Sequence, residues 1–313
     1  MFIDKEIVSL KKTFIIKCKF AQEMKDKISI DALIRLVDDP DEQVFVHVRD
    51  QLLNFGTYAL PFLQNSCDLL ESDLIFQSRI EQIIHEIQFE AIKNRLEIWV
   101  NSEEKDLVEA AIIVAKYQYP NFDETLIYNT IDHLVNDCWL ELNNRQTAFE
   151  KIKIINKIIF DFHGFQGDTI NYNSPLNSFI NAVIESRSGN PLSLSILYSI
   201  VAQALNIPVY GVNLPNHFVL AYMDEYGSRN YTDKKNDYGV LFYINPFSKG
   251  TLIDENSIQK FITDLKLTPQ RSYFEPCSNS TIITRMLSNL IVGYEQLGNK
   301  EKVEELNVLR SII

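Results

Sequence analysis

The spacing of the apolar residues changes once along the chain, close to residue 165. Before that point apolar side chains recur every three or four residues, the spacing expected of helices that bury one face. After it come "PVYGVNL", "HFVLAYM" and "GVLFYINPF", short runs rich in Val, Tyr and Phe that are typical of strands. From about residue 280 the pattern is helical again. The sequence therefore predicts a predominantly helical α+β fold with a short antiparallel sheet.

Residues 1–165 are predicted to form a helical region. Near residues 30–66 a helix, a "DDPD" break, a second helix and Gly56 follow one another. Gly56 is placed to end the second helix in a left-handed conformation. This order resembles a single HEAT-type unit. Residues 73–100 are expected to form one long helix, because isoleucines line one of its faces.

The end of the chain, residues 280–313, is predicted to form a helical hairpin. Two amphipathic segments meet at Gly298 and Asn299, and the pair resembles a tetratricopeptide (TPR-like) hairpin. No array of such units recurs at a fixed period. Residues 166–275 are left as a small core domain that contains the predicted strands.

Charge and composition restrict the partners that a chain of this kind can bind. The chain has 42 acidic and 30 basic residues, a formal net charge of −12, which argues against nucleic acid and against an anionic membrane surface. The first residues lack a basic segment followed by an apolar run, and no apolar stretch approaches the roughly 18 residues of a membrane helix. We expect a cytoplasmic protein. Its four cysteines form no CxxC pair, as is typical of reduced thiols: Cys18, Cys67, Cys138 and Cys277.

The core segment has the order of parts found in thiol enzymes. A helix is predicted from about Pro191 to Leu205, His217 begins the next strand but one, and Asn245 ends a later strand. Thiol enzymes place Cys at the N-terminus of a buried helix, where the helix dipole stabilises the thiolate. A His on a neighbouring strand then acts as base, and a side-chain oxygen orients that His.

Two stretches of the core resemble a known family. They are "NSFINAVIESRSGNPLSLSILYSIVAQALNIPVYGVNLPNHFVLAY" and "VLFYINPFSKG". They resemble the transglutaminase-like superfamily, which has a papain-like fold, and in particular its SirB-type branch, whose core also occurs in a eukaryotic F-box protein. The resemblance implies that the catalytic Cys position falls on Pro191, that His217 is the family's His, and that Asn245 replaces its Asp. The SirB-type branch is itself understood to lack the usual Cys.

Pro191 has no nucleophilic atom, so it cannot form an acyl-enzyme. Asn190 and Pro191 instead have the character of an N-cap and a first helical residue. Ser193 is the alternative nucleophile, in a hydrolase or acyl-transferase that also uses His217 and Asn245. At 3.6 residues per turn it lies about 200° around the helix from residue 191. Its hydroxyl is therefore expected to point away from the imidazole.

His217 has two interpretations. It is either a base or ligand contact in a cleft, or a buried polar residue whose ring bonds Asn245 and joins two strands. The remaining histidines lack HxxxH or HExxH spacing, so neither a metal nor a cofactor is expected. These histidines are His47, His85, His133 and His163.

Three functions are compatible with these patterns. The first is a transglutaminase-like protein without catalytic Cys that acts as a binding or regulatory scaffold, with a protein or peptide as partner. The second is the hydrolase or acyl-transferase based on Ser193. The third is a helical adaptor in which the core has no separate role. In the first, residues 171–179 are expected to lie beside the cleft and to offer hydrogen bonds to an extended peptide.

Overall fold

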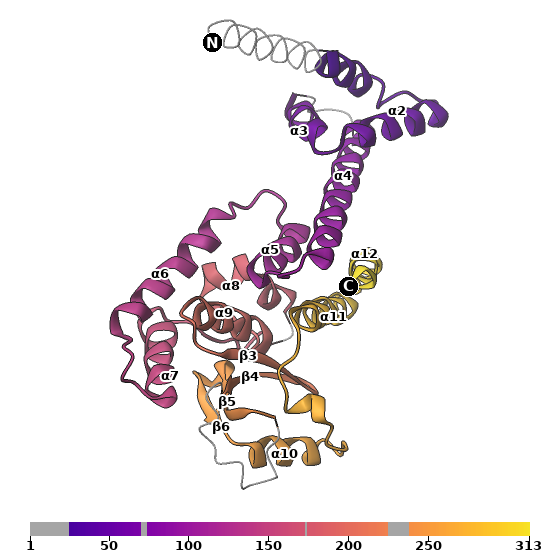
Figure 1. Cartoon of the computed structure of the whole chain (residues 1–313). Coiled ribbons are helices and arrows are strands. Elements are labelled where there is room, and N and C mark those ends of the chain that lie inside the picture. Colours follow the sequence, from indigo (N-terminus) through magenta and orange to yellow (C-terminus); the bar gives the residue numbers. More distant parts are fainter. Residues whose placement is uncertain (1–24, 70–73, 173, 225–237) are drawn as a thin grey trace, which may run out of the picture. The chain divides into compact units, whose positions relative to one another are not determined.

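A computed structural model of the chain describes residues 25–172, 174–224 and 238–313, apart from residues 70–73 and the side chains of residues 67–69 (Figure 1). The chain divides into two compact units, residues 1–92 and residues 93–313. The boundaries predicted near residues 165 and 280 both fall inside the second unit. None of the described helices is long and apolar enough to cross a bilayer.

The first unit is a small helical layer with its own core. Residues 25–34 are helical, and they are followed by α2 (Glu42–Phe55), a short 3-10 turn (Gly56–Ala59), α3 (Leu60–Leu69) and the first part of α4 (Leu74–Asn101). Asp41 caps α2, because its side chain accepts a hydrogen bond from the Gln43 N–H at 2.9 Å. Gly56 ends the helix where predicted, but its dihedrals, φ 56° and ψ −143°, lie outside the left-handed helical conformation that was expected; glycine still suits this positive φ. The likeness to a HEAT unit stays a prediction.

The second unit is built around a central helix. Its helices before the sheet are α5 (Leu107–Gln118), α6 (Thr125–Glu141), α7 (Ala148–Asn156), a π-helical turn η2 (Lys157–Phe162), a 3-10 turn η3 (Pro175–Ser178), α8 (Ile180–Ser186) and α9 (Pro191–Ala204). Residues 191–202 of α9 are all buried. A helix that is buried on every side belongs in a core, and α9 packs against α6, α8 and the sheet (Figure 1).

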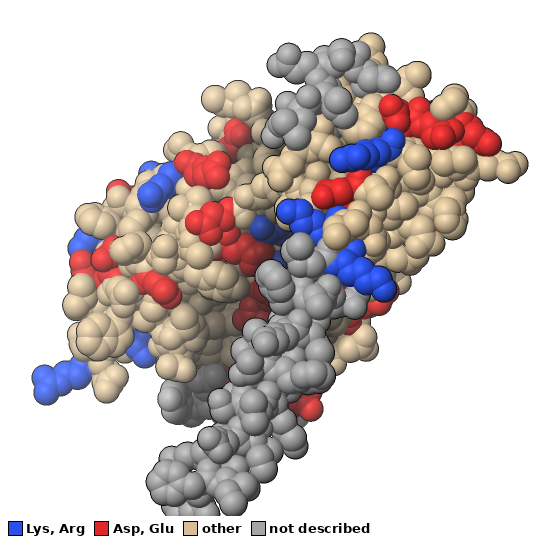
Figure 2. Space-filling view, turned by 90° about the horizontal axis from the view of Figure 1, so that it is seen from above, with Lys and Arg blue, Asp and Glu red and all other residues tan. Residues whose placement is uncertain are grey.

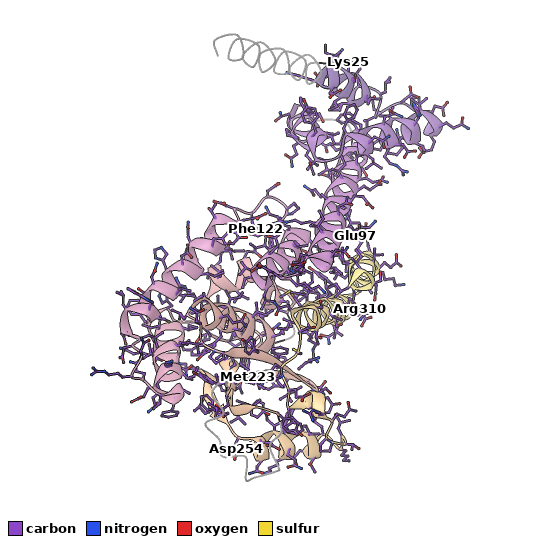
Figure 3. All side chains as sticks on the ribbon, viewed as in Figure 1. Lys25, Glu97, Phe122, Met223, Asp254 and Arg310 are labelled. Carbon is purple, nitrogen blue, oxygen red and sulfur yellow. The ribbon has the colours of Figure 1, made fainter. Side chains whose placement is uncertain are left out.

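The sheet has four antiparallel strands in the order β3 (Val209–Leu214), β4 (His217–Met223), β5 (Val240–Asn245) and β6 (Thr251–Ile253). The sequence predicted only three, because β6 is too short for alternation to be visible. Helix α9 lies on one face of the sheet and α10 (Glu255–Asp264) on the other, where Ile258 and Ile262 pack against Val212, Val219 and Tyr243 (Figure 1). In the side-chain view, Met223 marks the end of β4 and Asp254 the start of α10 (Figure 3). A two-residue parallel pair, β1 (Gln166–Gly167) with β2 (Ser188–Gly189), lies just before α9 in the chain.

One asparagine connects three segments of the second unit. Asn156, at the end of α7, accepts a hydrogen bond from the Tyr198 hydroxyl of α9 at 2.9 Å. Its own Nδ2 donates to the Gly250 carbonyl at 2.8 Å. Gly250 has φ 71°, and a Cβ on it would lie 2.0 Å from Asn156 Oδ1, so only glycine fits there. The contact fixes the loop after β5 to both helices.

The C-terminal helices α11 (Asn279–Gln296) and α12 (Lys300–Ile312) form a hairpin where it was predicted, joined by Gly298 at φ 73°. The hairpin is attached to α5 by polar contacts: the Tyr117 hydroxyl donates to Glu305 at 2.8 Å and the Tyr294 hydroxyl to Gln118 Oε1 at 2.7 Å. Arg310, which Figure 3 labels, lies on α12. Whether the hairpin is TPR-like stays a prediction.

Acidic and basic side chains are mixed over the described surface on the face shown in Figure 2. Among the described residues on this face, the Lys and Arg side chains do not form a continuous basic area of the kind that binds a phosphate backbone.

Candidate functional site

A cavity of about 540 Å³ opens between the start of α9, η3, the turn from β3 to β4, and α11. Its volume falls within the range of sites that hold small ligands or peptide side chains. Its fifteen lining residues are Tyr172, Ser174, Ser178, Asn190, Pro191, Leu192, Asn216, His217, Phe218, Arg285, Ser288, Asn289, Val292, Gly293 and Gln296. Pro191 and His217, which the family resemblance assigned to the same site, thus line one cavity. The expected place of residues 171–179 beside it is confirmed by Tyr172, Ser174 and Ser178.

The start of α9 is held by a closed set of hydrogen bonds. Asn190 Oδ1 accepts from the Ser193 N–H at 2.9 Å, and Ser193 Oγ accepts from the Asn190 N–H at 3.1 Å. Pro191 follows as the first helical residue, so the predicted cap is confirmed. Asn190 Nδ2 also donates to Ser178 Oγ at 2.9 Å, which ties η3 to the helix. A Cβ on Gly189 would lie 2.6 Å from Ser193 Oγ, which explains the glycine before the cap.

His217 is placed by a two-residue turn. Leu214 and His217 face each other as the last pair of the β3–β4 ladder, so Pro215 and Asn216 form the connection. Asn216 has φ 56°, a left-handed conformation that asparagine tolerates better than most residues, and proline suits the position before it. The imidazole is half-buried, and the ring of Phe261 lies 6.1 Å from it between centroids. The turn therefore presents His217 to the cavity at the end of a rigid strand.

The surroundings of His217 favour its neutral form. Burial lowers the pKa of the imidazole below its ordinary value of 6.5, the Asn245 amide raises it, and the charge of Arg285 lowers it again. Asn245 Oδ1 is nevertheless buried without a hydrogen-bond partner among the described residues, and its Nδ2 donates to Ser248 Oγ at 3.3 Å. Asn245 therefore acts on the electrostatics of the ring, while the hydrogen bond that would join the two strands through His217 stays a prediction.

This lowered pKa predicts a pH dependence of stability. The unfolded chain binds the proton of His217 more tightly than the folded chain does. The contribution of His217 to the unfolding free energy is therefore fully present above pH 6.5, decreases as the pH drops towards the folded pKa of His217, and stays constant below it. The wild type should therefore lose more unfolding free energy than His217→Gln between pH 7.5 and 5, by about 1.4 kcal/mol for each unit by which the pKa is lowered. Urea unfolding, followed by the fluorescence of Trp99 and Trp139 in the second unit, measures it. Parallel stability curves for the two proteins would contradict the expectation.

The serines of α9 are occupied with the backbone of their own helix. Ser193 Oγ, besides accepting from Asn190, donates to the Asn190 carbonyl at 3.3 Å. Ser195 Oγ donates to the Pro191 carbonyl at 2.6 Å and Ser199 Oγ to the Ile196 carbonyl at 3.1 Å. All three are buried, and none lines the cavity. Ser193 is therefore close in sequence to the lining residue Pro191, but its hydroxyl forms part of the helix cap and does not line the cavity.

The two thiols whose side chains are described are protected by burial. Cys138 lies in the interior face of α6, where burial raises the pKa of its thiol to about 12. Burial raises the pKa of the Cys277 thiol to about 11. Neither lines the cavity. Cys18 and the side chain of Cys67 lie outside the described residues.

Helix α11 contributes four polar residues to the cavity that sequence reasoning missed, namely Arg285, Ser288, Asn289 and Gln296. Arg285 Nε donates to Asn289 Oδ1 at 3.2 Å, and Nη1 donates to Asn213 Oδ1 at 3.2 Å and to the Leu214 carbonyl at 3.4 Å. Arg285 is half-buried, and burial lowers the pKa of its guanidinium. The only sequence pattern that could have indicated Arg285 is its spacing from Asn289, because residues four apart lie on the same face of a helix.

The arrangement of a buried helix, an antiparallel sheet and a His at the start of a strand can be compared with known proteins. A model of the transglutaminase-like superfamily matches residues 125–288, more than half of the chain. The chain belongs to the transglutaminase-like superfamily. The match runs from α6 into α11, and therefore includes the cap of α9, His217 and Arg285.

The individual relatives of this superfamily member are distant in sequence. A UPF0162 protein of Xylella fastidiosa is 27% identical over 197 residues, which cover 61% of this chain and 66% of the relative. A UPF0162 protein of Vibrio cholerae is 26% identical over 190 residues, 59% of this chain and 65% of the relative. F-box only protein 21 of Mus musculus is 28% identical over 151 residues, 48% of this chain and 22% of the relative. The chain thus spans slightly less than two thirds of the bacterial relatives. No solved structure matches it.

Proposed function

We propose that this transglutaminase-like protein has neither transglutaminase nor protease activity and that its cavity holds a segment of a protein partner, as in a binding or regulatory scaffold. The observation that carries the proposal is the residue at the start of α9. Pro191 lines the cavity together with His217, and it offers no atom that can attack an acyl group. The helix N-terminus and the imidazole are retained there without a nucleophile between them.

The alternative, a hydrolase or acyl-transferase based on Ser193, finds less support. The Ser193 hydroxyl is engaged with the backbone of Asn190 on both its donor and acceptor sides. Moving it towards His217 would break the cap of α9. Asn245 also carries no charge, and exchange of the corresponding carboxylate for an amide lowers the rate of a serine triad by a factor on the order of 10⁴. Both observations favour the binding function over the enzymatic one.

The composition of the cavity wall supports a peptide as the occupant. Hydrogen-bonding groups from η3 and the β3–β4 turn stand next to the apolar side chains of Phe218, Leu192 and Val292. Sites of this mixed character take an extended segment, because backbone amides need hydrogen bonds and side chains need apolar contact. Helix α11 forms the wall on the side of Val292, whose side chain is half exposed.

Activity assays test the catalytic half of the proposal. The purified chain should incorporate no fluorescent amine into casein and should not hydrolyse amide or ester substrates above the rate of His217→Ala. A substrate turnover that His217→Ala or Ser193→Ala abolishes would contradict the proposal and favour the hydrolase.

Selection of peptides tests the binding half. A phage-displayed random peptide library should yield sequences that bind the wild type at least about tenfold more tightly than Val292→Trp, since the indole would fill the cavity from its exposed edge. Val292→Ala serves as the matched control, because it changes the same position without filling the cavity. If no peptide distinguishes the wild type from Val292→Trp, the cavity is not the binding site.

A further inference from the structure

Arg285 carries a charge that no acidic side chain among the described residues pairs with. Its three hydrogen bonds go to neutral acceptors, two amide oxygens and one backbone carbonyl, and no carboxylate of a described residue acts on its charge. Arg95 of α4 shows the usual arrangement for a half-buried guanidinium in this molecule. It binds Glu109 at 2.7 Å and Glu124 at 2.9 Å. A cation drawn partly out of water is stabilised by an anion, and no described residue supplies one to Arg285.

The wall around Arg285 is depleted of negative charge. The sequence has 42 acidic residues, yet none of the fifteen described residues that line the cavity is Asp or Glu. The other titratable side chains of the wall are His217 and Tyr172, and the remaining polar groups are hydroxyls and amides. A cavity in an acidic protein that excludes carboxylates and holds one guanidinium has the electrostatic character of an anion site.

The geometry leaves one edge of the guanidinium available. Nε and Nη1 are held by Asn289, Asn213 and the Leu214 carbonyl, which fixes the plane of the group. Nη2 has no hydrogen-bond partner among the described residues, and it is not sealed from solvent. A guanidinium fixed on one side and open on the other binds an oxyanion with little further loss of side-chain freedom.

We infer that the cavity binds a single carboxylate of a peptide, with Arg285 as its anchor and the amide and hydroxyl groups of Asn216, Asn289 and Ser174 as neutral donors around it. The inference rests on the proposed function, because it specifies the partner segment that the cavity would hold. One guanidinium balances the single charge of a carboxylate. A doubly charged phosphate monoester calls for a cluster of arginines, and Arg285 is the only Arg or Lys among the described lining residues.

Two sources of a carboxylate are distinguished by the choice of probe. N-acetylglycylglycine carries a terminal carboxylate, N-acetylisoglutamine a side-chain carboxylate, and N-acetylglycylglycinamide none. Each is titrated into the ¹⁵N-labelled full chain at constant ionic strength, and the Nε–H resonance of Arg285 is followed. We expect at least one carboxylate probe to shift this resonance saturably with a millimolar Kd, while the amide leaves it unchanged. The carboxylate probe that binds with the lower Kd shows whether the natural carboxylate is a chain terminus or a side chain.

Variants then test whether Arg285 is the anchor. Arg285→Gln should weaken binding of the carboxylate probe about 10–100-fold, the loss expected for a charge-assisted hydrogen bond, as read from the shifts of the Asn216 and His217 amides. Arg285→Lys keeps the charge but not the fork and should give a smaller loss. Arg145→Gln is the matched control: it removes one positive charge from an exposed side chain outside the cavity and should bind like the wild type. Circular dichroism of each variant verifies that it is folded.

Several outcomes would overturn the inference. One is an Arg285 resonance that no carboxylate probe shifts, and another is an equal loss of binding in Arg145→Gln. Tighter binding of inorganic phosphate than of either carboxylate would reject the carboxylate in favour of a phosphorylated ligand. The carboxylate inference can fail while the proposed function holds. Peptides that distinguish the wild type from Val292→Trp, together with carboxylate probes that shift no resonance, would support the binding function and reject only the carboxylate as ligand.

Discussion

Pro191→Cys is expected to convert the start of α9 into a reactive thiol site. The new side chain would lie at the N-terminus of a buried helix and line the same cavity as His217. The helix N-terminus stabilises a thiolate and the imidazole can accept the thiol proton; surroundings of this kind lower a cysteine pKa from about 8.5 to between about 3.5 and 7.5. At pH 7 we expect alkylation by iodoacetamide at least about tenfold faster than that of an unperturbed thiol.

Peptide mass spectrometry reads each cysteine separately, so the natural thiols serve as internal references. Cys277 and Cys138, with pKa values raised to about 11 and about 12 by burial, should remain almost unlabelled. Adding His217→Gln to Pro191→Cys should slow labelling and move its pH profile upwards, because the imidazole can then no longer take the proton of the thiol. Labelling of the introduced thiol with the rate and pH profile of a free cysteine would show that the cavity no longer has the electrostatics of a thiol site.

Asn156→Ala is expected to cause the largest loss of stability among simple substitutions near the site, about 2–4 kcal/mol. It removes the acceptor of the Tyr198 hydroxyl, which is fully buried, and the donor to the Gly250 carbonyl. Two polar groups would then lack partners in the interior. Urea unfolding observed through Trp99 and Trp139 measures the change in the second unit.

A double-mutant cycle separates this hydrogen bond from simple loss of packing. Tyr198→Phe removes only the hydroxyl, and in that background Asn156→Ala should cost less, because no hydroxyl is left unpaired. If the two effects simply add, the bond between Asn156 and Tyr198 contributes nothing, and the loss comes from Gly250 or from packing.

The sequence was informative wherever the deciding interactions are local. The cap formed by Asn190, Pro191 and Ser193 involves residues at most three apart, and the turn that places His217 involves four consecutive residues. Gly56 and Gly298 ended helices where their neighbours indicated. Such signals act through backbone conformation and short-range hydrogen bonds, which a single sequence contains in full.

Interactions between distant segments could not be predicted in the same way. The Asn156 contacts join residues 42 and 94 positions apart, and nothing in "KIIN" indicates them. Strand β6 has three residues and is defined by its pairing with β5. Arg285 reaches the cavity because α11 packs beside η3 and β3, which depends on the whole second unit. The resemblance identified the positions of Pro191 and His217, but not the cation across from them.

The walls of the cavity have separate origins in the chain. Pro191 and His217 belong to the helix and strand that form the centre of the second unit, whereas Arg285 and Asn289 belong to α11, near the C-terminal end of the chain. Substitutions on the exposed turns of α11 can therefore alter the ligand preference with little disturbance of the buried centre. Under the proposed binding function, α11 is therefore the helix on which a change of ligand specificity would cost the least folding stability.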